Sequence, residues 1–220
     1  SKDKLNKAVK DLSTKEKKVL GFMLDNRDID SFEPAFNSML EKLNQCGISQ
    51  FDILVNNAGV NSGSMPEITE EEYDSVMDTN LKGTFFMAQM FGKYFRKNHI
   101  CGNILNIGSA SSLRPANSPY ILSKWGIRAL TMGLAKSLGR DGITVNGIAP
   151  GPTATPMMIN RKDANMTLDR ILLGRYIMPE EIANMAVILV SEMGRSIMGD
   201  IIYMTGGAGN LTYDDVPYSF

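Results

Sequence analysis

The chain has 220 residues, of which 43% are hydrophobic and 21% are charged. This composition is typical of one globular domain with a sizeable core, and it excludes a disordered or collagen-like chain. Lysine and arginine number 23 against 24 aspartates and glutamates, so the net charge of -1 offers no basic field for nucleic acid or an anionic membrane. The longest wholly apolar run, Met185 to Val190, is far shorter than the roughly 20 residues of a membrane-spanning helix.

The cysteines, the histidine and the first residues also narrow the class of protein. The segment from Ser1 to Leu5 lacks the apolar stretch of a secretory signal, and Cys46 and Cys101 do not make a disulfide framework. A cytoplasmic protein is therefore expected. With His99 as the one histidine and no Cys-x-x-Cys, a His/Cys metal cluster cannot form within one chain, so no metal is expected.

Helical and strand periodicities alternate along the chain. The expected elements are a helix from Leu5 to Leu12, a strand from Lys18 to Leu24, a helix over 31–46, a strand from Phe51 to Val55, a helix from Thr69 to about Lys97, a strand from Asn103 to Ile107, a helix from Pro119 to Leu138, a strand from Ile143 to Ala149, a helix from Pro179 and a strand from Asp200 to Met204. Thr69 with Glu72 and Ser118 with Pro119 are typical of helix starts.

This alternation predicts one α/β domain over residues 1–220, with a doubly wound parallel sheet and helices on both of its faces. In such sheets, ligands bind beyond the carboxyl ends of the strands. The candidate binding positions therefore follow the expected strands and are Asp25, Asn56 to Gly59, Ser109 and Pro150 to Thr155.

Tyr120 and Lys124 lie four residues apart on one expected helix, the spacing at which side chains meet. A phenol is a poor acid or base at neutral pH, and a nearby ammonium favours its ionised form. The pair alone is weak, because a surface tyrosine and a solvated lysine fit the same spacing.

The order of the polar motifs gives the pair its context. They are Asp25, Asn56-Asn57-Ala58-Gly59, Asn80, Ser109, Tyr120-x-x-x-Lys124 and the stretch from Asn146 to Thr155. In this order the chain resembles the classical short-chain dehydrogenase/reductases, which have a Rossmann-like fold, and the resemblance extends from Leu5 to Gly207. It is similar to 3-oxoacyl carrier-protein reductases and to sugar or polyol dehydrogenases within that family.

The resemblance implies a catalytic set of four residues. Tyr120 would be the general acid/base, and Lys124 would hold the nicotinamide ribose hydroxyls and favour the ionised tyrosine. Ser109 would orient and polarise the substrate carbonyl, while Asn80 would hold a water that links Lys124 to solvent. The reaction implied is the interconversion of a secondary alcohol and a ketone, with hydride transfer belonging to the nicotinamide.

The resemblance also implies NAD or NADP as cofactor and assigns its contacts. Asp25 would accept a hydrogen bond from the adenine amino group, with the backbone of Asn26 beside it. The adenosine would be lined by Asn56, Ala58 and Gly59, and the nicotinamide end by Pro150, Gly151, Thr153 and Thr155. The choice between NAD and NADP stays open, because the ribose-sensing residue at the end of the family's second strand is not in the sequence.

Three of these assignments have structural alternatives. Asn56 and Asn57 fit equally well a role in tying one strand end to its neighbour. Ser111 and Ser112 compete with Ser109, because the interval to the tyrosine is shorter than is usual in the family. Asn80 also fits a bend in the helix. Ser109 is preferred because it directly follows the expected strand.

The glycine-rich turn that places a pyrophosphate on a helix N-terminus is missing from the sequence. The cluster Gly206-Gly207-Ala208-Gly209 follows the last strand and leads to no expected helix. In the family, a first βαβ unit with this turn precedes the segment that begins here at Ser1. The natural protein is expected to carry that unit, because a sheet without its central strand would expose a broad apolar edge. The alternative is a complete chain that cannot bind the pyrophosphate in the usual way.

The resulting hypothesis is an oxidoreductase for a small-molecule substrate, selected by the stretch from Met157 to Met178 and by the tail from Leu211 to Phe220. The resemblance implies a homotetramer, with a dimer as the alternative. Trp125 is expected at a subunit interface, since it would point away from Tyr120. The alternative hypothesis is a catalytically silent family member or fragment that serves in assembly.

Overall fold

In a computed structural model, the structure describes residues 1–14, 16–155, 166–169 and 171–209, and it contains a four-stranded parallel sheet. The strands, in spatial as well as chain order, are β1 (Ile53–Asn56), β2 (Asn103–Ile107), β3 (Thr144–Pro150) and β4 (Ile201–Met204). In the register, Asn56 lies beside Asn106, and Asn106 beside Gly147. Because the strands are parallel, their carboxyl ends meet at one edge of the sheet.

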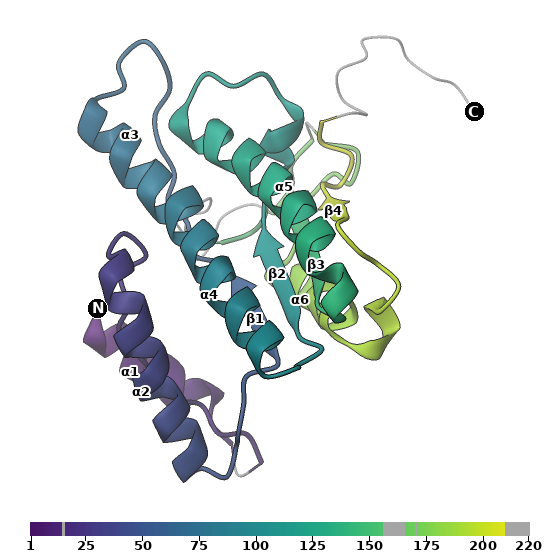
Figure 1. Cartoon of the computed structure of the whole chain (residues 1–220). Helices are drawn as coiled ribbons and strands as arrows, with labels where there is room; N and C mark the ends of the chain where they lie inside the picture. The colour runs from purple at the N-terminus through teal and green to yellow at the C-terminus, as the bar shows by residue number, and fades with distance from the viewer. Residues whose placement is uncertain (15, 156–165, 170, 210–220) are drawn as a thin grey trace.

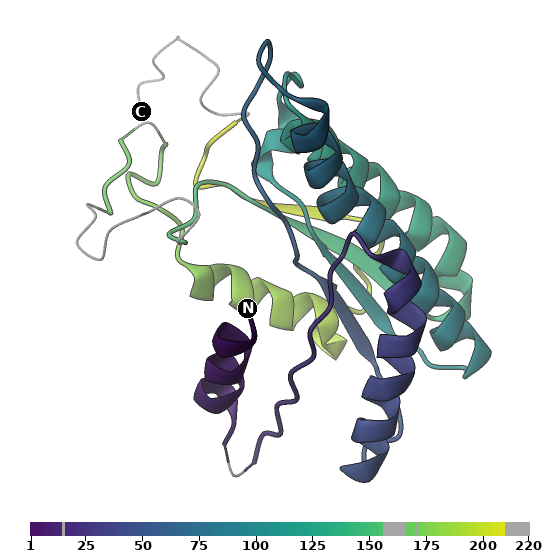
Figure 2. The ribbon, with the colours of Figure 1, turned by 90° about the vertical axis from the view of Figure 1, so that its left-hand side faces the viewer.

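Helices cover both faces of the sheet, as predicted. They are α1 (Lys2–Leu12), α2 (Phe32–Gln45), α3 (Glu70–Met77), α4 (Gly83–Lys97), α5 (Pro119–Leu138) and α6 (Pro179–Val190). Figures 1 and 2 show α4 and α5 side by side on one face and α6 on the other. The doubly wound α/β fold is therefore confirmed.

The alternation of side chains along the strands separates two cores. Ile104 and Val145 lie in the core on the side of α4 and α5, which also contains Phe95. Leu105 and Ile148, one or three positions further along their strands, pack in the core on the side of α6. Burial on both faces explains why these strands are apolar runs rather than half-polar ones.

The strand expected from Lys18 to Leu24 is wrong. Residues 17–25 run between α1 and α2 without pairing in the sheet, as the dark purple trace in Figure 2 shows. Gly21 packs closely on Val9 of α1, while Leu20 and Met23 stay exposed. A strand needs the backbone groups of a neighbouring strand, and none of the described strands pairs with this segment, so its apolar pattern alone does not make it one.

The single helix expected from Thr69 to Lys97 is instead three pieces. Thr69 begins α3 as predicted, its Oγ1 accepting from the Glu72 backbone N–H at 3.2 Å. The helical path then widens into a π-helical segment, η2 (Asp78–Lys82), before α4 begins. Such segments often occur at functional sites. This one carries Asn80, whose buried side chain bonds outside its own helix.

The other predicted helix start is confirmed at α5. Ser118 Oγ accepts from the Ile121 backbone N–H at 3.3 Å, and Pro119 occupies the first helical turn. A one-turn 3-10 helix, η3 (Ala110–Leu113), fills the space between β2 and the loop leading to α5. Tyr120 is therefore fixed in the first turn of a long helix that starts near the carboxyl edge of the sheet.

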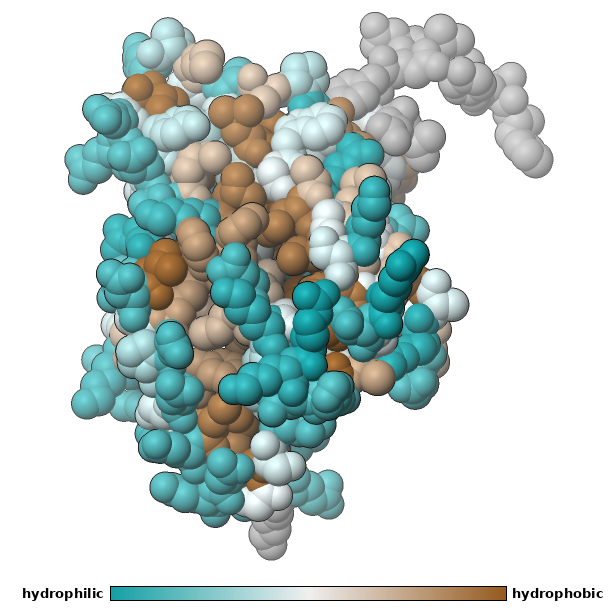
Figure 3. Space-filling model, in the orientation of Figure 1, coloured by the Kyte–Doolittle hydropathy of each residue, from teal (hydrophilic) through white to brown (hydrophobic). Residues whose placement is uncertain are grey.

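Two apolar surfaces stay exposed in the described part of the chain. On β1, Ile53 and Val55 are 41% and 49% exposed, and only one edge of this strand is paired among the described strands. Figure 3 shows hydrophobic residues gathered over α4 and α5, where the exposed side chains include Phe85, Trp125 and Met132. Among the helices of the described residues, none has the length and apolarity to cross a bilayer.

Candidate active site

Lys124 is the buried charge at the carboxyl edge of the sheet. Its side chain points from α5 to the end of β2, where Nζ donates to the Ile107 carbonyl at 2.9 Å. Nζ also lies 5.7 Å from the centroid of the Tyr120 ring, so the two side chains share one region of the molecule. Among the described residues no other acceptor bonds to this ammonium, which leaves two of its three N–H groups for a ligand.

Burial controls the charge of this lysine. The residue is 6% exposed, and the loss of water lowers the pKa of Lys124 from 10.5 to about 8. The side chain is therefore still mostly protonated at neutral pH. A cation beside a phenol ring is suited to stabilising negative charge on that phenol.

Asn80 holds the loop after β1 against this lysine. Its Oδ1 accepts from the Val60 N–H at 2.8 Å, and its Nδ2 donates to the Val60 carbonyl at 2.9 Å and to Ser123 Oγ at 3.1 Å. A Cβ placed on Gly59 would lie 3.5 Å from Asn80 Oδ1 and 3.7 Å from Lys124 Nζ. Asn80, Gly59 and Lys124 are thus neighbours. Both amide N–H groups of Asn80 are used, so the water implied by the resemblance has an acceptor on Oδ1 but no donor.

Ser109 follows β2 and begins η3. Its buried Oγ accepts from the Ser111 backbone N–H at 3.1 Å, and the hydroxyl proton has no acceptor among the residues that the structure describes, so it can donate to a ligand. Ser112 has a different environment, since its Oγ donates to the Ser109 carbonyl at 2.8 Å and lies 3.4 Å from Tyr203 Oη. The contacts of Ser112 therefore hold the turn together, while those of Ser109 leave a donor available.

Asn56 takes part in a buried polar chain between strands. Its Nδ2 donates to Asn106 Oδ1 at 2.9 Å, and Asn106 Nδ2 donates to Thr131 Oγ1 at 3.0 Å. The strand-tying alternative is thus the arrangement that the structure shows. The implied contacts of Asn56 and Ala58 with adenosine stay predictions.

The segment from Pro150 to Thr155 leaves the end of β3 and packs beside the end of β4. Gly151 donates its N–H to the Met204 carbonyl at 2.8 Å, and a Cβ on it would approach the Thr205 backbone to 2.8 Å, so only glycine fits. Thr153 forms an isolated bridge with Ile177, and Thr155 donates its N–H to the Thr153 carbonyl at 2.8 Å. The nicotinamide contacts expected of this segment stay predictions.

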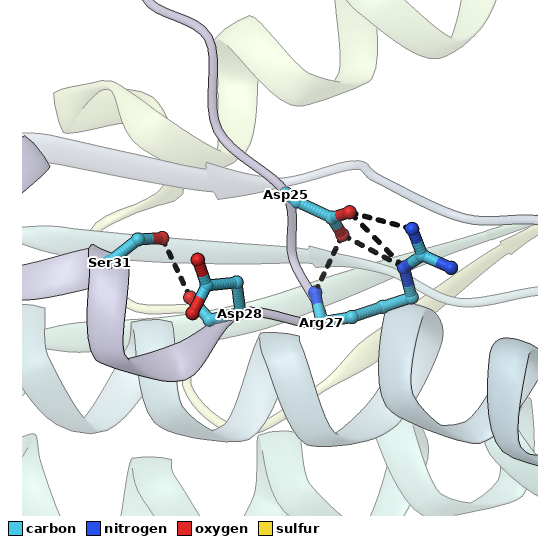
Figure 4. A network of polar contacts seen from close by, with 4 residues as sticks. All are labelled: Asp25, Arg27, Asp28 and Ser31. Carbon is cyan, nitrogen blue, oxygen red and sulfur yellow. Dashed lines mark hydrogen bonds and ion pairs between the residues drawn. The ribbon is translucent and has the colours of Figure 1, made fainter.

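Asp25 forms an ion pair that the sequence analysis did not anticipate. Its Oδ1 accepts from the Arg27 backbone N–H at 2.9 Å and from Arg27 Nε at 3.0 Å, and Oδ2 accepts from Nη2 at 2.7 Å (Figure 4). Hydrogen bonds from the side chain and then the backbone of Arg27 lower the pKa of Asp25 to about 2. An aspartate two residues before an arginine was the signal for this pair.

Asn26 anchors this turn to the π-helical segment. Its Nδ2 donates to the Thr79 carbonyl at 3.4 Å. A Cβ on Gly83 would lie 2.5 Å from the Asn26 carbonyl oxygen, so the two backbones touch and position 83 requires glycine. The Asp25 turn and the loop held by Asn80 therefore pack on the same short piece of helix.

Ser123 was also missed by the sequence analysis. It is fully buried, accepts from Asn80, and its Oγ donates to the Tyr120 carbonyl at 2.7 Å. Its place between Tyr120 and Lys124, on the same helix, was the available signal. Ser123 links the π-helical segment to the helical turn that carries the tyrosine.

An ion pair anchors the segment before α6. Arg175 bonds to both carboxylate oxygens of Glu181, at 2.8 and 3.0 Å, and Glu181 accepts from the Met178 N–H at 2.8 Å. The Arg175 side chain and then the Met178 backbone lower the pKa of Glu181 to about 2. Of the residues expected to select the substrate, positions 157–165, 170 and 211–220 lie outside the described residues.

The described donors and acceptors fit the two ends of a nicotinamide dinucleotide. The two N–H groups of Lys124 that bond to none of the described residues, beside Gly59, suit ribose hydroxyls. The Asp25 carboxylate is an acceptor that suits an amino group, and Arg27 occupies it in the structure. The glycines that follow β4 are Gly206, Gly207 and Gly209, and all three have positive φ. A Cβ on Gly207 would meet Leu172 at 2.9 Å, so this turn packs closely on the segment before α6. Within the described ranges, no group of three or more His, Cys, Asp or Glu side chains is arranged to hold a metal ion.

Comparisons with known proteins identify the family of the chain. The family model described as enoyl-(acyl carrier protein) reductase matches residues 1–209. The chain is 33% identical over 212 residues to a 3-oxoacyl-[acyl-carrier-protein] reductase of Thermotoga maritima, covering 94% of this chain and 84% of the relative. It is 38% identical over 163 residues to glucose 1-dehydrogenase 2 of Bacillus subtilis, covering 71% of this chain and 63% of the relative.

The crystal structure of a short chain dehydrogenase from Bacillus anthracis superimposes with a TM-score of 0.82 at 31% sequence identity, covering 99% of this chain and 85% of that chain. A dehydrogenase/reductase from Sinorhizobium meliloti superimposes with a TM-score of 0.80 at 30% identity, over 94% of this chain and 81% of that one. The sequence matches and the superpositions agree with the parallel α/β fold. The chain therefore belongs to the short-chain dehydrogenase/reductase family of oxidoreductases, whose enzymes use NAD or NADP.

Proposed function

We propose that the protein interconverts a secondary alcohol and a ketone, with NAD or NADP as cofactor and Tyr120 as general acid/base. The observation that carries this proposal is the buried Lys124 ammonium. It lies 5.7 Å from the centroid of the Tyr120 ring and bonds to the carboxyl end of β2. Burying a cation is costly unless it is paired, and among the described residues this ammonium has one hydrogen-bond acceptor and two N–H groups left beside a phenol, which is typical of a functional site.

The residues that would hold the cofactor lie along the carboxyl edge of the sheet. Lys124 would bond to the nicotinamide ribose, Asp25 with Asn26 would meet the adenine, and Asn56, Ala58 and Gly59 would line the adenosine between them. The segment with Pro150, Gly151, Thr153 and Thr155 would contact the nicotinamide. When bound, the nicotinamide supplies or accepts the hydride.

The proton is moved by Tyr120. In the reductive direction its hydroxyl gives a proton to the substrate oxygen, and in the oxidative direction the phenolate takes it back. The protonated Lys124 stabilises the phenolate between these events. Ser109 donates its free hydroxyl proton in a hydrogen bond to the same oxygen, which orients the carbonyl and stabilises the charge that develops on it. Asn80 keeps Gly59 and Lys124 in place.

The substrate proposed is a small molecule with a hydroxyl or ketone group. The relatives are named for different substrates, among them a 3-oxoacyl group on a carrier protein, glucose and a 3alpha-hydroxysteroid. All of these names imply the interconversion of a hydroxyl and a carbonyl, but the rest of the substrate differs from one relative to the next. The proposal is therefore made at the level of the reacting group.

The protein is proposed to act in the cytoplasm as a homotetramer. Apolar side chains of Phe85, Leu122, Trp125 and Met132 are exposed on α4 and α5 (Figure 3). A contiguous apolar surface of this kind is typical of a subunit interface. The Trp125 indole N–H donates to the Arg114 carbonyl at 2.8 Å, so the ring is held in place with part of it exposed.

The decisive experiment is replacement of the proposed acid. Tyr120→Phe removes the hydroxyl without removing the ring, so we expect turnover to fall by about 10²–10⁴-fold, the usual contribution of a general acid. Reduction of a 3-oxoacyl thioester and oxidation of glucose are followed by absorbance of NADH and NADPH. Binding of either dinucleotide, measured by fluorescence, should stay close to that of the wild type.

Tyr73→Phe is the matched control, because Tyr73 is an exposed tyrosine of α3. It should leave turnover unchanged. Retention of most activity by Tyr120→Phe would contradict the assignment of the acid. Equal inactivity of the wild type with all substrates, together with normal folding and dinucleotide binding, would support the silent-member alternative.

A further inference from the structure

The Asp25 carboxylate is nearly saturated by a residue of its own turn. A carboxylate offers about four lone-pair positions for hydrogen bonds. Oδ1 receives the Arg27 backbone N–H and Nε, while Oδ2 receives Nη2 at 2.7 Å and a longer contact from Nε at 3.2 Å. A ligand amino group that approaches Asp25 therefore meets a carboxylate whose acceptor positions are largely taken (Figure 4).

Several carboxylates other than Asp25 lie near Arg27. With Ser75, it lines a groove of about 520 Å³ whose other lining residues are all acidic, namely Glu70, Glu71, Asp74 and Asp78. The hydrogen bond to Asp25 is the main reason why the pKa of Arg27 is raised, and the charge of Asp78 adds to it. Asp78 also pairs with Lys82 at 3.2 Å. The guanidinium therefore lies between one carboxylate that holds it and a group of carboxylates that can receive it.

We propose that Arg27 weakens binding of the adenine end of the cofactor by competing with the adenine amino group for Asp25, and that it moves toward the α3 carboxylates when the ligand binds. This inference rests on the proposed function, since Asp25 is assigned to adenine there. It adds a residue that no part of that assignment contains. Arg27 is a residue that sets affinity, and it takes no part in proton or hydride transfer.

The expected effect is modest, because the ion pair is exposed. The side chains of Arg27 and Asp25 are 54% and 51% exposed, and exposed ion pairs contribute little in water. Removing the competitor should therefore tighten adenine binding by about two- to fivefold. High salt, which screens exposed pairs, should reduce the difference.

The test compares the wild type with Arg27→Gln, using adenosine and NADH as probes in calorimetric titrations at low and high salt. Adenosine carries no charge, so its binding does not respond to the lost positive charge on the protein. We expect Arg27→Gln to bind adenosine about two- to fivefold more tightly at low salt. Arg114→Gln, which removes another exposed arginine, should bind adenosine like the wild type.

Two further measurements separate competition from other causes. In the double variant Asp25→Asn/Arg27→Gln the gain in adenosine affinity should vanish, because the contested carboxylate is gone. In the wild type, adenosine should shift the Arg27 Nε–Hε signal in a nitrogen-15 NMR spectrum. Unchanged or weaker adenosine binding by Arg27→Gln, or no adenosine binding by either form, overturns the proposal.

The outcome is distinguishable from failure of the proposed function. That function is tested by turnover of Tyr120→Phe, whereas the role of Arg27 is read from adenosine binding in a protein with an intact Tyr120. Tighter adenosine binding by Arg27→Gln together with full activity of Tyr120→Phe would retain the adenine competition and reject the assigned acid.

Discussion

Burial determines how readily the side chain of Lys124 carries its charge. Its ammonium is removed from water by α5 and β2 and has one carbonyl as a partner among the described residues. Desolvation disfavours the charged form, which is why the pKa falls to about 8 rather than staying at 10.5. The same burial that places the cation beside Tyr120 therefore reduces the stability of the folded protein while the lysine is charged.

This linkage gives a pH dependence with a definite sign. Between pH 8 and 10.5 the folded protein has released the Lys124 proton that the unfolded chain still holds, so the free energy of unfolding rises with pH across that window. The full change corresponds to about 3 kcal/mol, of which about 2 kcal/mol has developed by about pH 9.5. Urea unfolding of the wild type and of Lys124→Met at about pH 7 and about pH 9.5 measures it, since the variant lacks this titration.

The wild type should gain free energy of unfolding relative to Lys124→Met as the pH is raised. A difference between the two proteins that stays constant with pH would show that Lys124 titrates normally. Subtracting the free energy of unfolding of the variant at each pH removes the contributions that the two proteins share.

At the residue scale, the sequence predicted the positions of site residues but not the groups to which their side chains bond. The four-residue spacing placed Tyr120 and Lys124 together because helix geometry is local. The Asp25–Arg27 pair and the bonds of Asn80 to Val60 depend on how loops turn in space, which no periodicity encodes. Asn56 had two readings from sequence, and only the position of Asn106 on the neighbouring strand shows the tie.

At the scale of elements, the π-helical segment η2 stabilises the fold through hydrogen bonds that its sequence pattern does not predict. Asn80→Ala removes three hydrogen bonds and leaves the N–H and carbonyl of Val60 without this partner. Three hydrogen bonds are lost, one of them at the fully buried Ser123, so we expect the free energy of unfolding to fall by about 2–3 kcal/mol in urea unfolding followed by circular dichroism.

Asn98→Ala is the matched control for that variant. Asn98 follows α4, is exposed, and makes one side-chain hydrogen bond, from Nδ2 to the Tyr94 carbonyl at 2.8 Å. Its loss should change the free energy of unfolding by less than about 1 kcal/mol. Similar losses for Asn80→Ala and Asn98→Ala would contradict the structural weight assigned to η2.

The ion pair between Arg175 and Glu181 acts on one segment rather than on the whole fold. Glu181→Gln removes a charge that bonds to Arg175 and to the Met178 backbone, so the strand-like contact of Thr153 with Ile177 should open more often. Hydrogen exchange should accelerate at the Ala154 and Ile177 amides, whose bonds are 2.9 Å long.

The wild-type protection should follow the protonation of Glu181. Because its pKa is lowered from 4.5 to about 2, the stabilisation is present above pH 4.5 and is lost as the pH falls toward 2. Glu180→Gln, in the same first turn of α6 and exposed, serves as the control and should leave these amides protected. Faster exchange in both variants would point to the helix start rather than to the ion pair.

Helix starts could be predicted from sequence, while one strand could not. Thr69 and Ser118 cap their helices because a hydroxyl bonding to the N–H three residues later is a local interaction. Residues 18–24 have a strand-like apolar pattern, but pairing is a property of two segments. The segment packs on α1 instead, with Gly21 close to Val9.

At the scale of the whole molecule, the fold class followed from the alternation of elements, and the assembly did not. Helices between strands force parallel pairing and cover both faces, which is why the sheet order β1-β2-β3-β4 agrees with the expected doubly wound form. An exposed apolar face on α4 and α5 becomes visible only when the packing of both helices is known. The resemblance implies an assembly, and the exposed face on α4 and α5 is where we propose that it forms.

Charge placed on this face should separate the subunits. In Phe85→Glu/Met132→Glu, carboxylates replace two side chains that are 45% and 55% exposed, so a dry interface there would have to bury unpaired charge. Light scattering after size-exclusion chromatography should show a lower mass than for the wild type. Leu12→Glu on α1, at an equally exposed apolar position, should keep the wild-type mass.

An unchanged mass for Phe85→Glu/Met132→Glu would place any contact between copies elsewhere. If Leu12→Glu alone dissociated the assembly, α1 would have to be the interface. Circular dichroism of each variant shows whether the monomer keeps its helical content, so that loss of mass is not confused with unfolding.

The outer side of β1 is where the sheet of these 220 residues has room for a further strand. Ile53 and Val55 face outward beside a row of backbone amides and carbonyls that no described strand pairs with. An open border of this kind accepts the backbone of another strand. In a chain that carries the βαβ unit expected ahead of Ser1, we expect a strand of that unit to lie here, both side chains to be covered and the amides of β1 to exchange more slowly with solvent.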